Sequence, residues 1–72
     1  MHSENNRPDF VVENIHRLAD FRKAQGITQI KLAEMLNISA ATINGYENYT
    51  YPRQEMYNRL AEIFGWQKWK EE

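Results

Sequence analysis

The side chains that could do chemistry in this sequence of 72 residues do not form a catalytic set. His2 lies in a polar N-terminal stretch, and His16 stands alone in a helical pattern without a cluster of metal ligands. Ser39 has no evident base to activate its hydroxyl, no Asp or Glu pair is singled out, and there is no cysteine. The glycines form no phosphate-binding loop. The sequence therefore predicts neither an enzyme nor a cofactor or metal site.

Two short helices, predicted at Gln29–Leu36 and Ala40–Glu47, carry the polar groups with a clearer role. Apolar residues three or four positions apart define one face of the first helix, and Ile43 is the aliphatic anchor of the second. Asn37 tolerates the left-handed backbone that ends a helix, and Ser39 offers a hydroxyl to cap the next one. Helices joined by so short a turn must cross at a large angle. This is the helix-turn-helix unit, whose second helix can enter the DNA major groove.

The same stretch carries a pattern that resembles the Cro/C1-type helix-turn-helix family of bacterial and phage DNA-binding domains. The resemblance covers roughly residues 15–65, and it rests on Phe21, Arg22, Gly26, Ile27, Thr28, Gln29, Leu32, Ala33, Ile38, Ser39, Ile43, Tyr46 and Glu47. It implies a compact all-α domain of four to five helices, lambda-repressor-like, that binds double-stranded DNA. We expect a transcriptional regulator, a repressor, that binds a two-fold operator as a homodimer, because one small domain makes few contacts.

The resemblance also implies which residues of the motif face DNA. Gln29 begins the first helix of the motif, where its amide and the free N–H groups of the helix end would point at a phosphate. Asn44 is able to read adenine through two hydrogen bonds, whereas Gly45 either lets the helix sit deep in the groove or is a tolerated surface glycine. Lys31 and Arg53 are candidates for contacts with the DNA backbone, and the alternative for each is an ordinary solvated charge. The predicted DNA-binding set is Gln29, Lys31, Ser39, Ala40, Ala41, Thr42, Asn44, Gly45, Asn48 and Arg53.

Helical periodicity predicts two further helices around the motif. One runs from Asp9 to Gln25, and its apolar stripe continues to Arg22, so that this charge must be paired if it is buried. The spacing of the second motif helix places Glu47 on its inner face, and the resemblance implies an ion pair between Arg22 and Glu47. The other helix is opened by Pro52 and ended by Gly65.

Aromatic side chains are concentrated in the second half of the chain. Trp66 and Trp69 are predicted to share a face of one more helical turn, residues 66–70, with one ring covering the core and the other in a dimer interface. Tyr49 and Tyr51 lie in a loop that departs from the family pattern, and we expect them to reach solvent, a phosphate or a partner protein. This Tyr49–Tyr51 loop is the predicted contact for a protein partner.

The composition of the chain indicates the cellular location of the protein and suggests an alternative function. The sequence has no cysteine, no apolar run of membrane-spanning length and no apolar signal-peptide core. We expect a disordered arm, residues 1–8, then one domain, residues 9–72, in a cytoplasmic bacterial or phage protein. The net charge of −1 and the pI of about 6.1 argue against the basic character typical of a DNA-binding domain. The alternative is a protein-interaction module, antitoxin-like or a phage accessory protein, with weak DNA readout.

Overall fold

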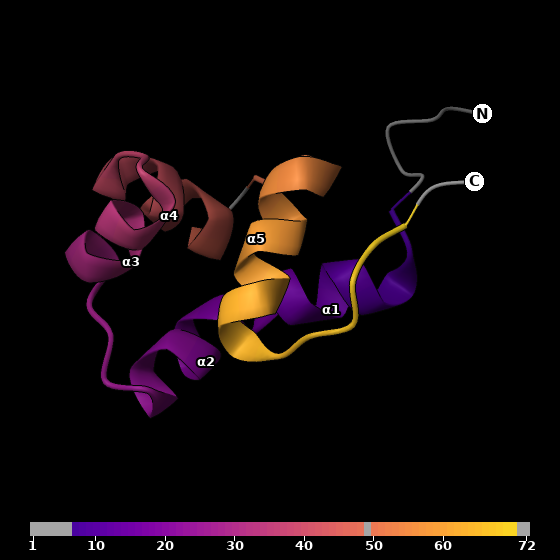
Figure 1. Ribbon diagram of the computed structural model, residues 1–72, viewed down its shortest axis with the longest axis horizontal. Helices are drawn as coiled ribbons and strands as arrows, with labels where there is room; N and C mark the ends of the chain where they lie inside the picture. The colour runs from indigo at the N-terminus through magenta and orange to yellow at the C-terminus, as the bar shows by residue number, and fades with distance from the viewer. Residues whose placement is uncertain (1–6, 49, 71–72) are drawn as a thin grey trace.

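The computed structural model describes residues 7–48 and 50–70, and this part of the chain folds into five α-helices around one core (Figure 1). They are α1 (Asp9–His16), α2 (Leu18–Ala24), α3 (Gln29–Leu36), α4 (Ala40–Asn48) and α5 (Gln54–Phe64). In Figure 1, α3 packs on α4 at one end, α5 stands in the middle, and α1 and α2 run below. The described residues contain no strand, so the predicted all-α fold is confirmed. None of their helices is long and apolar enough to cross a membrane.

The prediction of one helix over residues 9–25 is wrong in one respect. The structure has two helices there, α1 and α2, separated by a break at Arg17. Arg17 has φ −105° and ψ 13°, and its N–H is shared between the carbonyl oxygens of Glu13 at 3.2 Å and Asn14 at 3.1 Å. Helical hydrogen bonding resumes where the Phe21 N–H donates to the Arg17 carbonyl at 3.0 Å. Neither proline nor glycine marks this break, so the sequence carries no local signal for it.

The turns on either side of α3 are built by local capping, which the sequence predicted for Asn37 and Ser39. Thr28 caps α3 and Ser39 caps α4, each accepting a hydrogen bond from the backbone N–H three residues on, at 3.0 and 3.1 Å. Asn37 and Gly26 both adopt the left-handed conformation that ends a helix, with φ of 59° and 69°. The short connections before and after α3 therefore follow from the residues that occupy them.

The chain after α5 does not form the predicted further helical turn. Gly65, with φ 75°, ends α5, and residues 66–70 run back along α1 without helical structure (yellow in Figure 1). Side chains of α5 hold their backbone. The Trp69 N–H donates to Asn58 Oδ1 at 2.7 Å, and the Trp69 carbonyl accepts from Asn58 Nδ2 at 2.9 Å and Gln54 Nε2 at 2.8 Å. These bonds replace the helical ones, and residues 66–70 are termed the C-terminal segment below.

Tyr57 lies fully buried where α5, α1 and the C-terminal segment meet. Its ring stacks on Trp66 with centroids 5.5 Å apart and meets Trp69 edge-on at 6.2 Å. Its hydroxyl donates to the Gln67 carbonyl at 2.9 Å and accepts from Asn14 Nδ2 at 3.0 Å. Burial raises the pKa of the Tyr57 hydroxyl, so this group stays protonated and keeps its donor. The buried core consists of Val11, Ile15, Leu18, Leu32, Ala33, Leu36, Ile43, Tyr57, Leu60, Ala61, Trp66 and Trp69.

The two tryptophans belong to this core, where each keeps 9% of its surface exposed. The helical face that Trp66 and Trp69 were expected to share is absent, because the C-terminal segment is not helical. A dimer contact through these rings is not tested by one chain and stays a prediction. The area that either ring could offer to a partner is small.

Candidate nucleic-acid interface

Arg22 and Glu47 join α2 to the end of α4. Arg22 Nε donates to Glu47 Oε2 at 2.6 Å and Arg22 Nη2 donates to Glu47 Oε1 at 3.2 Å, a paired geometry that a lysine could not reproduce. The remaining nitrogen, Nη1, donates to the Ile27 carbonyl at 2.9 Å. The side chains keep only 9% and 7% of their surface exposed. The ion pair expected from the sequence is therefore present, and it is shielded from water.

The Glu47 carboxylate is held in its ionised form. Burial is the largest influence on its pKa and acts to raise it. Hydrogen bonds from Arg22 and Gln29, together with attraction to Arg22 and Lys23, act in the opposite direction. The net result is a Glu47 pKa below its ordinary value. At neutral pH Glu47 is thus an acceptor of hydrogen bonds and never a donor.

Gln29, predicted to contact a phosphate, turns its side chain towards α4. Its Nε2 donates to Glu47 Oε1 at 2.9 Å and to Asn44 Oδ1 at 3.3 Å. Both amide hydrogens of Gln29 are therefore used inside the motif. A phosphate contact through this side chain would have to break one of these two hydrogen bonds. The Lys31 N–H is used by the Thr28 cap, so the backbone N–H groups of Gln29 and Ile30 are the first-turn donors of α3 left for an anion at this helix end.

The exposed stripe of α4 consists of Ala41, Asn44 and Asn48, which lie three and four residues apart. Asn48 Nδ2 donates to the backbone carbonyl of Asn44 at 2.8 Å and to its side-chain Oδ1 at 3.0 Å. Asn48, a member of the predicted DNA-binding set, thus uses its amide hydrogens within α4. At the start of the helix Ser39 is exposed and Thr42 half-buried, and their hydroxyls are hydrogen-bonded at 2.9 Å.

Two residues expected at the DNA-facing surface of α4 lie elsewhere. Ala40 is half-buried and packs against the core. Gly45 is buried, and a Cβ atom there would lie 3.2 Å from Thr50 Oγ1. The Thr50 N–H also donates to the Gly45 carbonyl at 2.9 Å. Both interpretations of Gly45, a groove-facing glycine and a surface glycine, are wrong, because its missing side chain makes room for the chain that follows α4.

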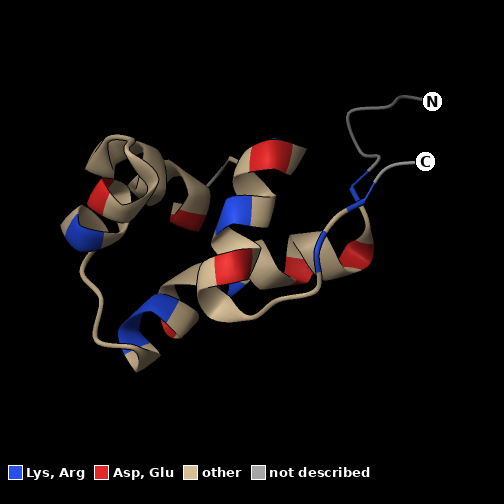
Figure 2. Cartoon of the chain, in the orientation of Figure 1, with Lys and Arg blue, Asp and Glu red and all other residues tan. Residues whose placement is uncertain are grey.

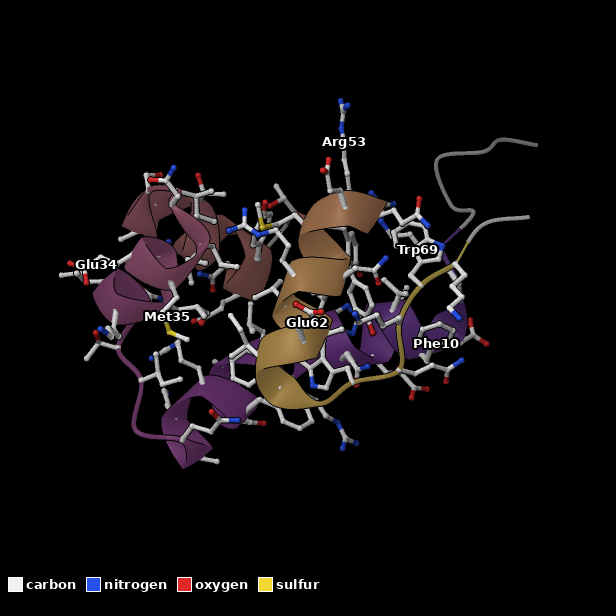
Figure 3. The ribbon with its side chains drawn as sticks, viewed as in Figure 1. Phe10, Glu34, Met35, Arg53, Glu62 and Trp69 are labelled. Carbon is white, nitrogen blue, oxygen red and sulfur yellow. The ribbon has the colours of Figure 1, made fainter. Side chains whose placement is uncertain are left out.

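The basic candidates lie beside α4 and not on it. Lys31 on α3 and Arg53 are both exposed, and Figure 3 shows Arg53 extending away from the domain at the start of α5. That helix begins at Gln54, two residues after Pro52, and not at the proline itself. Figure 2 shows no lysine or arginine on α4, and on α3 the charge of Lys31 is balanced by Glu34. The surface formed by α3 and α4 is therefore close to neutral.

The aromatic loop after α4 is tied to α1. Tyr51 is half-buried, and its hydroxyl lies 2.7 Å from His16 Nε2. The Arg7 guanidinium lies 4.9 Å from the centroid of the Tyr51 ring. Arg7 belongs to the predicted disordered arm, residues 1–8, whose first six residues lie outside the described chain. Tyr49, the other half of the predicted partner contact, also lies outside it, and Tyr51 already has partners within the domain.

The helix pair α3–α4, capped and joined by a tight left-handed turn, defines a helix-turn-helix DNA-binding domain. A family model described as "Helix-turn-helix" matches residues 18–66, more than half of the chain, and the chain belongs to this family in its Cro/C1-type form. Its members are DNA-binding domains of the kind found in transcriptional regulators, and they are typically not enzymes. Comparison with curated proteins and with solved structures gave no significant match. The described residues contain no group of three or more His, Asp or Glu placed to hold a metal ion.

Proposed function

We propose that this protein is a sequence-specific transcriptional repressor that binds a two-fold operator as a homodimer, with α4 in the major groove. The observation that carries the proposal is the polar chain in which Arg22 contacts Glu47, Glu47 contacts Gln29, and Gln29 contacts Asn44. This chain holds α4 against α2 and α3 and ends at the exposed stripe of α4. A helix fixed in this way loses little conformational freedom when it binds, so more of its contact energy contributes to affinity.

The proposed contacts divide into those that position the domain and those that read sequence. The backbone N–H groups of Gln29 and Ile30, with the side chains of Lys31 and Arg53, would contact phosphates and fix the register on the duplex. Asn44 would read a base edge, and the Ala41 methyl group is suited to a thymine methyl. With so few base contacts, useful specificity requires two half-sites, which is the reason for proposing a dimer.

The near-neutral surface predicts a shallow dependence of affinity on salt. If Lys31 and Arg53 of both protomers each neutralise one phosphate, log affinity should fall against log salt with a slope of about −3.6, against about −10 for lac repressor. Fragments are first selected from a random DNA pool at low salt, and binding of one selected fragment is then titrated at several salt concentrations by fluorescence anisotropy.

Matched variants make this experiment specific to the proposed face. Lys31→Ala removes two phosphate contacts per dimer and should make the slope shallower by about 1.8. Lys68→Ala, beside Glu62 near the end of α5, should leave the slope unchanged because this end of α5 lies opposite the start that carries Arg53. If no fragment is enriched at low salt, the DNA-binding proposal fails. Wild-type protein that sediments as a monomer, both free and on the selected fragment, would contradict the dimer.

A second function, a protein-interaction module with weak DNA readout, is favoured by a different observation. Ile30 and Met35 of α3 are the large apolar side chains that stay exposed in the described residues, with 65% and 44% of their surface accessible (Met35 is labelled in Figure 3). An antitoxin-like or phage accessory protein would use such a surface. Ile30→Ser should then abolish partner binding, whereas under the repressor proposal it should leave the salt slope and the selected sequence unchanged.

A further inference from the structure

We propose that Asn44 selects guanine, and not adenine, at its base-pair position, because Gln29 and Asn48 occupy its side-chain oxygen. The inference rests on the proposed DNA-binding function and deepens it. An asparagine with both amide atoms free matches adenine, to which it donates one hydrogen bond and from which it accepts another. The surroundings of Asn44 in this protein allow only the donating half of that interaction.

The orientation of the Asn44 amide follows from its partners. Asn48 Nδ2 is 2.8 Å from the Asn44 backbone carbonyl, which can only accept, so this end of the Asn48 amide is the donor. Gln29 Nε2 is 2.9 Å from Glu47 Oε1, a carboxylate oxygen that can only accept, so this end of the Gln29 amide is also the donor.

Both donors then converge on one atom of the Asn44 side chain. Asn48 Nδ2 is 3.0 Å from it and Gln29 Nε2 is 3.3 Å from it. Because two N–H groups point at this atom, it must be the oxygen, and the Asn44 NH2 group must lie on the other side of the amide. Exchanging the oxygen and nitrogen of Asn44 would place donors against donors at both contacts.

The consequence is a donor without an acceptor on the exposed face of α4. A carboxamide oxygen has two lone pairs, and at Asn44 both are used. Within residues 7–48 and 50–70 no group accepts a hydrogen bond from Asn44 Nδ2, and Asn44 is exposed. In the major groove adenine presents one acceptor, N7, beside the N6 donor, whereas guanine presents two acceptors, N7 and O6. The two hydrogens of one nitrogen match guanine, as the ammonium group of a lysine does.

The test uses a DNA fragment selected by the wild-type protein. Asn44→Ala identifies the position that Asn44 reads, because preference should relax there and nowhere else. At that position the G·C pair is replaced by an A·T pair. In separate fragments the guanine alone is replaced by 7-deazaguanine, which lacks N7, or by hypoxanthine, which keeps both N7 and O6. Adenine and 7-deazaguanine should weaken binding, adenine by roughly 5- to 150-fold, the range for one good base contact. Hypoxanthine should bind as guanine does.

A second variant tests the cause of the preference. Asn48→Ala frees one lone pair of the Asn44 oxygen, so the ratio of guanine to adenine affinity should fall towards unity. Gln67→Ala removes the exposed amide of the C-terminal segment and should leave the ratio unchanged. Adenine as the wild-type preference at this position, or an Asn48→Ala ratio equal to that of wild type, would overturn the inference while leaving DNA binding intact. Failure to enrich any fragment would instead remove the proposed function and this inference with it.

Discussion

Replacing Arg22 by methionine should be among the most destabilising single changes in this protein. The substitution leaves the Glu47 carboxylate, 7% exposed, without its charged partner. Glu47→Leu instead strands the Arg22 guanidinium. Of the three acceptor atoms that the guanidinium contacts, only the Ile27 carbonyl oxygen then remains. Stranding one member of a buried pair costs about 3–5 kcal/mol. A domain of 72 residues has a free energy of unfolding of only about 4–11 kcal/mol, so either change removes a large part of it.

The double variant separates the value of the pair from the cost of breaking it. Methionine and leucine together fill much of the same volume and strand no charge, so Arg22→Met/Glu47→Leu should lie within about 2 kcal/mol of wild type. Urea unfolding followed by tryptophan fluorescence gives the free energy for all four proteins. Losses that simply add in the double variant, or single losses below about 1 kcal/mol, would refute the reasoning, because they would show two independent, solvated residues.

The protein contains a matched control for this cycle. Lys68 and Glu62 also form an ion pair, with Nζ and Oε2 2.9 Å apart, but their side chains are 45% and 70% exposed. Solvent and salt screen such a pair, so Lys68→Met, Glu62→Leu and their combination should leave the unfolding midpoint almost unchanged. A loss at this pair as large as that at Arg22 and Glu47 would show that burial is not the source of the difference.

Three further changes test other parts of the structure. The pKa of Glu47 in the folded protein lies below its unfolded value of about 4.3. The ionised carboxylate therefore stabilises the fold fully above that pH, and this stabilisation is lost as the pH falls through the folded pKa. The difference in free energy of unfolding between wild type and Glu47→Gln should be smaller at pH 3 than at pH 7. Gly45→Ala should raise the free energy of unfolding by less than about 1 kcal/mol, because the gain in helix propensity is reduced by the contact of the new methyl group with Thr50. Thermal unfolding should show that Gly45→Ala/Thr50→Ala recovers more of that gain. Tyr57→Phe should cost about 1–3 kcal/mol by leaving the Gln67 carbonyl without this donor, and a neutral result in urea unfolding would show that the hydroxyl does not hold the C-terminal segment.

Features that depend on neighbours in the chain were predictable from the residues alone. Thr28 and Ser39 cap helices through N–H groups three residues away, and Asn37 and Gly26 end helices through their own backbone conformation. Such interactions close within one turn, so the residue types that make them can be recognised without knowing the fold. Together with the apolar spacing of the two motif helices, Asn37 and Ser39 predicted the helix-turn-helix unit.

The Arg22–Glu47 pair is an intermediate case, because its partners are 25 residues apart. Periodicity placed Arg22 on an apolar stripe and Glu47 on an inner helix face, and the burial cost of a lone charge required a partner for each. Periodicity alone left the choice of partner open, and the resemblance to the Cro/C1-type family supplied it. Their hydrogen bonds to Ile27 and Gln29 became visible only in the folded chain.

Tertiary packing alone decided the features for which no local signal exists. The break at Arg17 has no proline or glycine, and residues 66–70 leave helical geometry because side chains of α5 bond their backbone. Gly45 is buried because the chain returns over α4 to bring Thr50 against it. The sequence identifies Asn44 as a residue able to read a base, but which of its amide atoms is free depends on Gln29, which lies 15 residues away on another helix. A hydrogen-bond donor or acceptor is a property of the residue, whereas its availability is set by the groups that the fold brings within 3 Å or so of it.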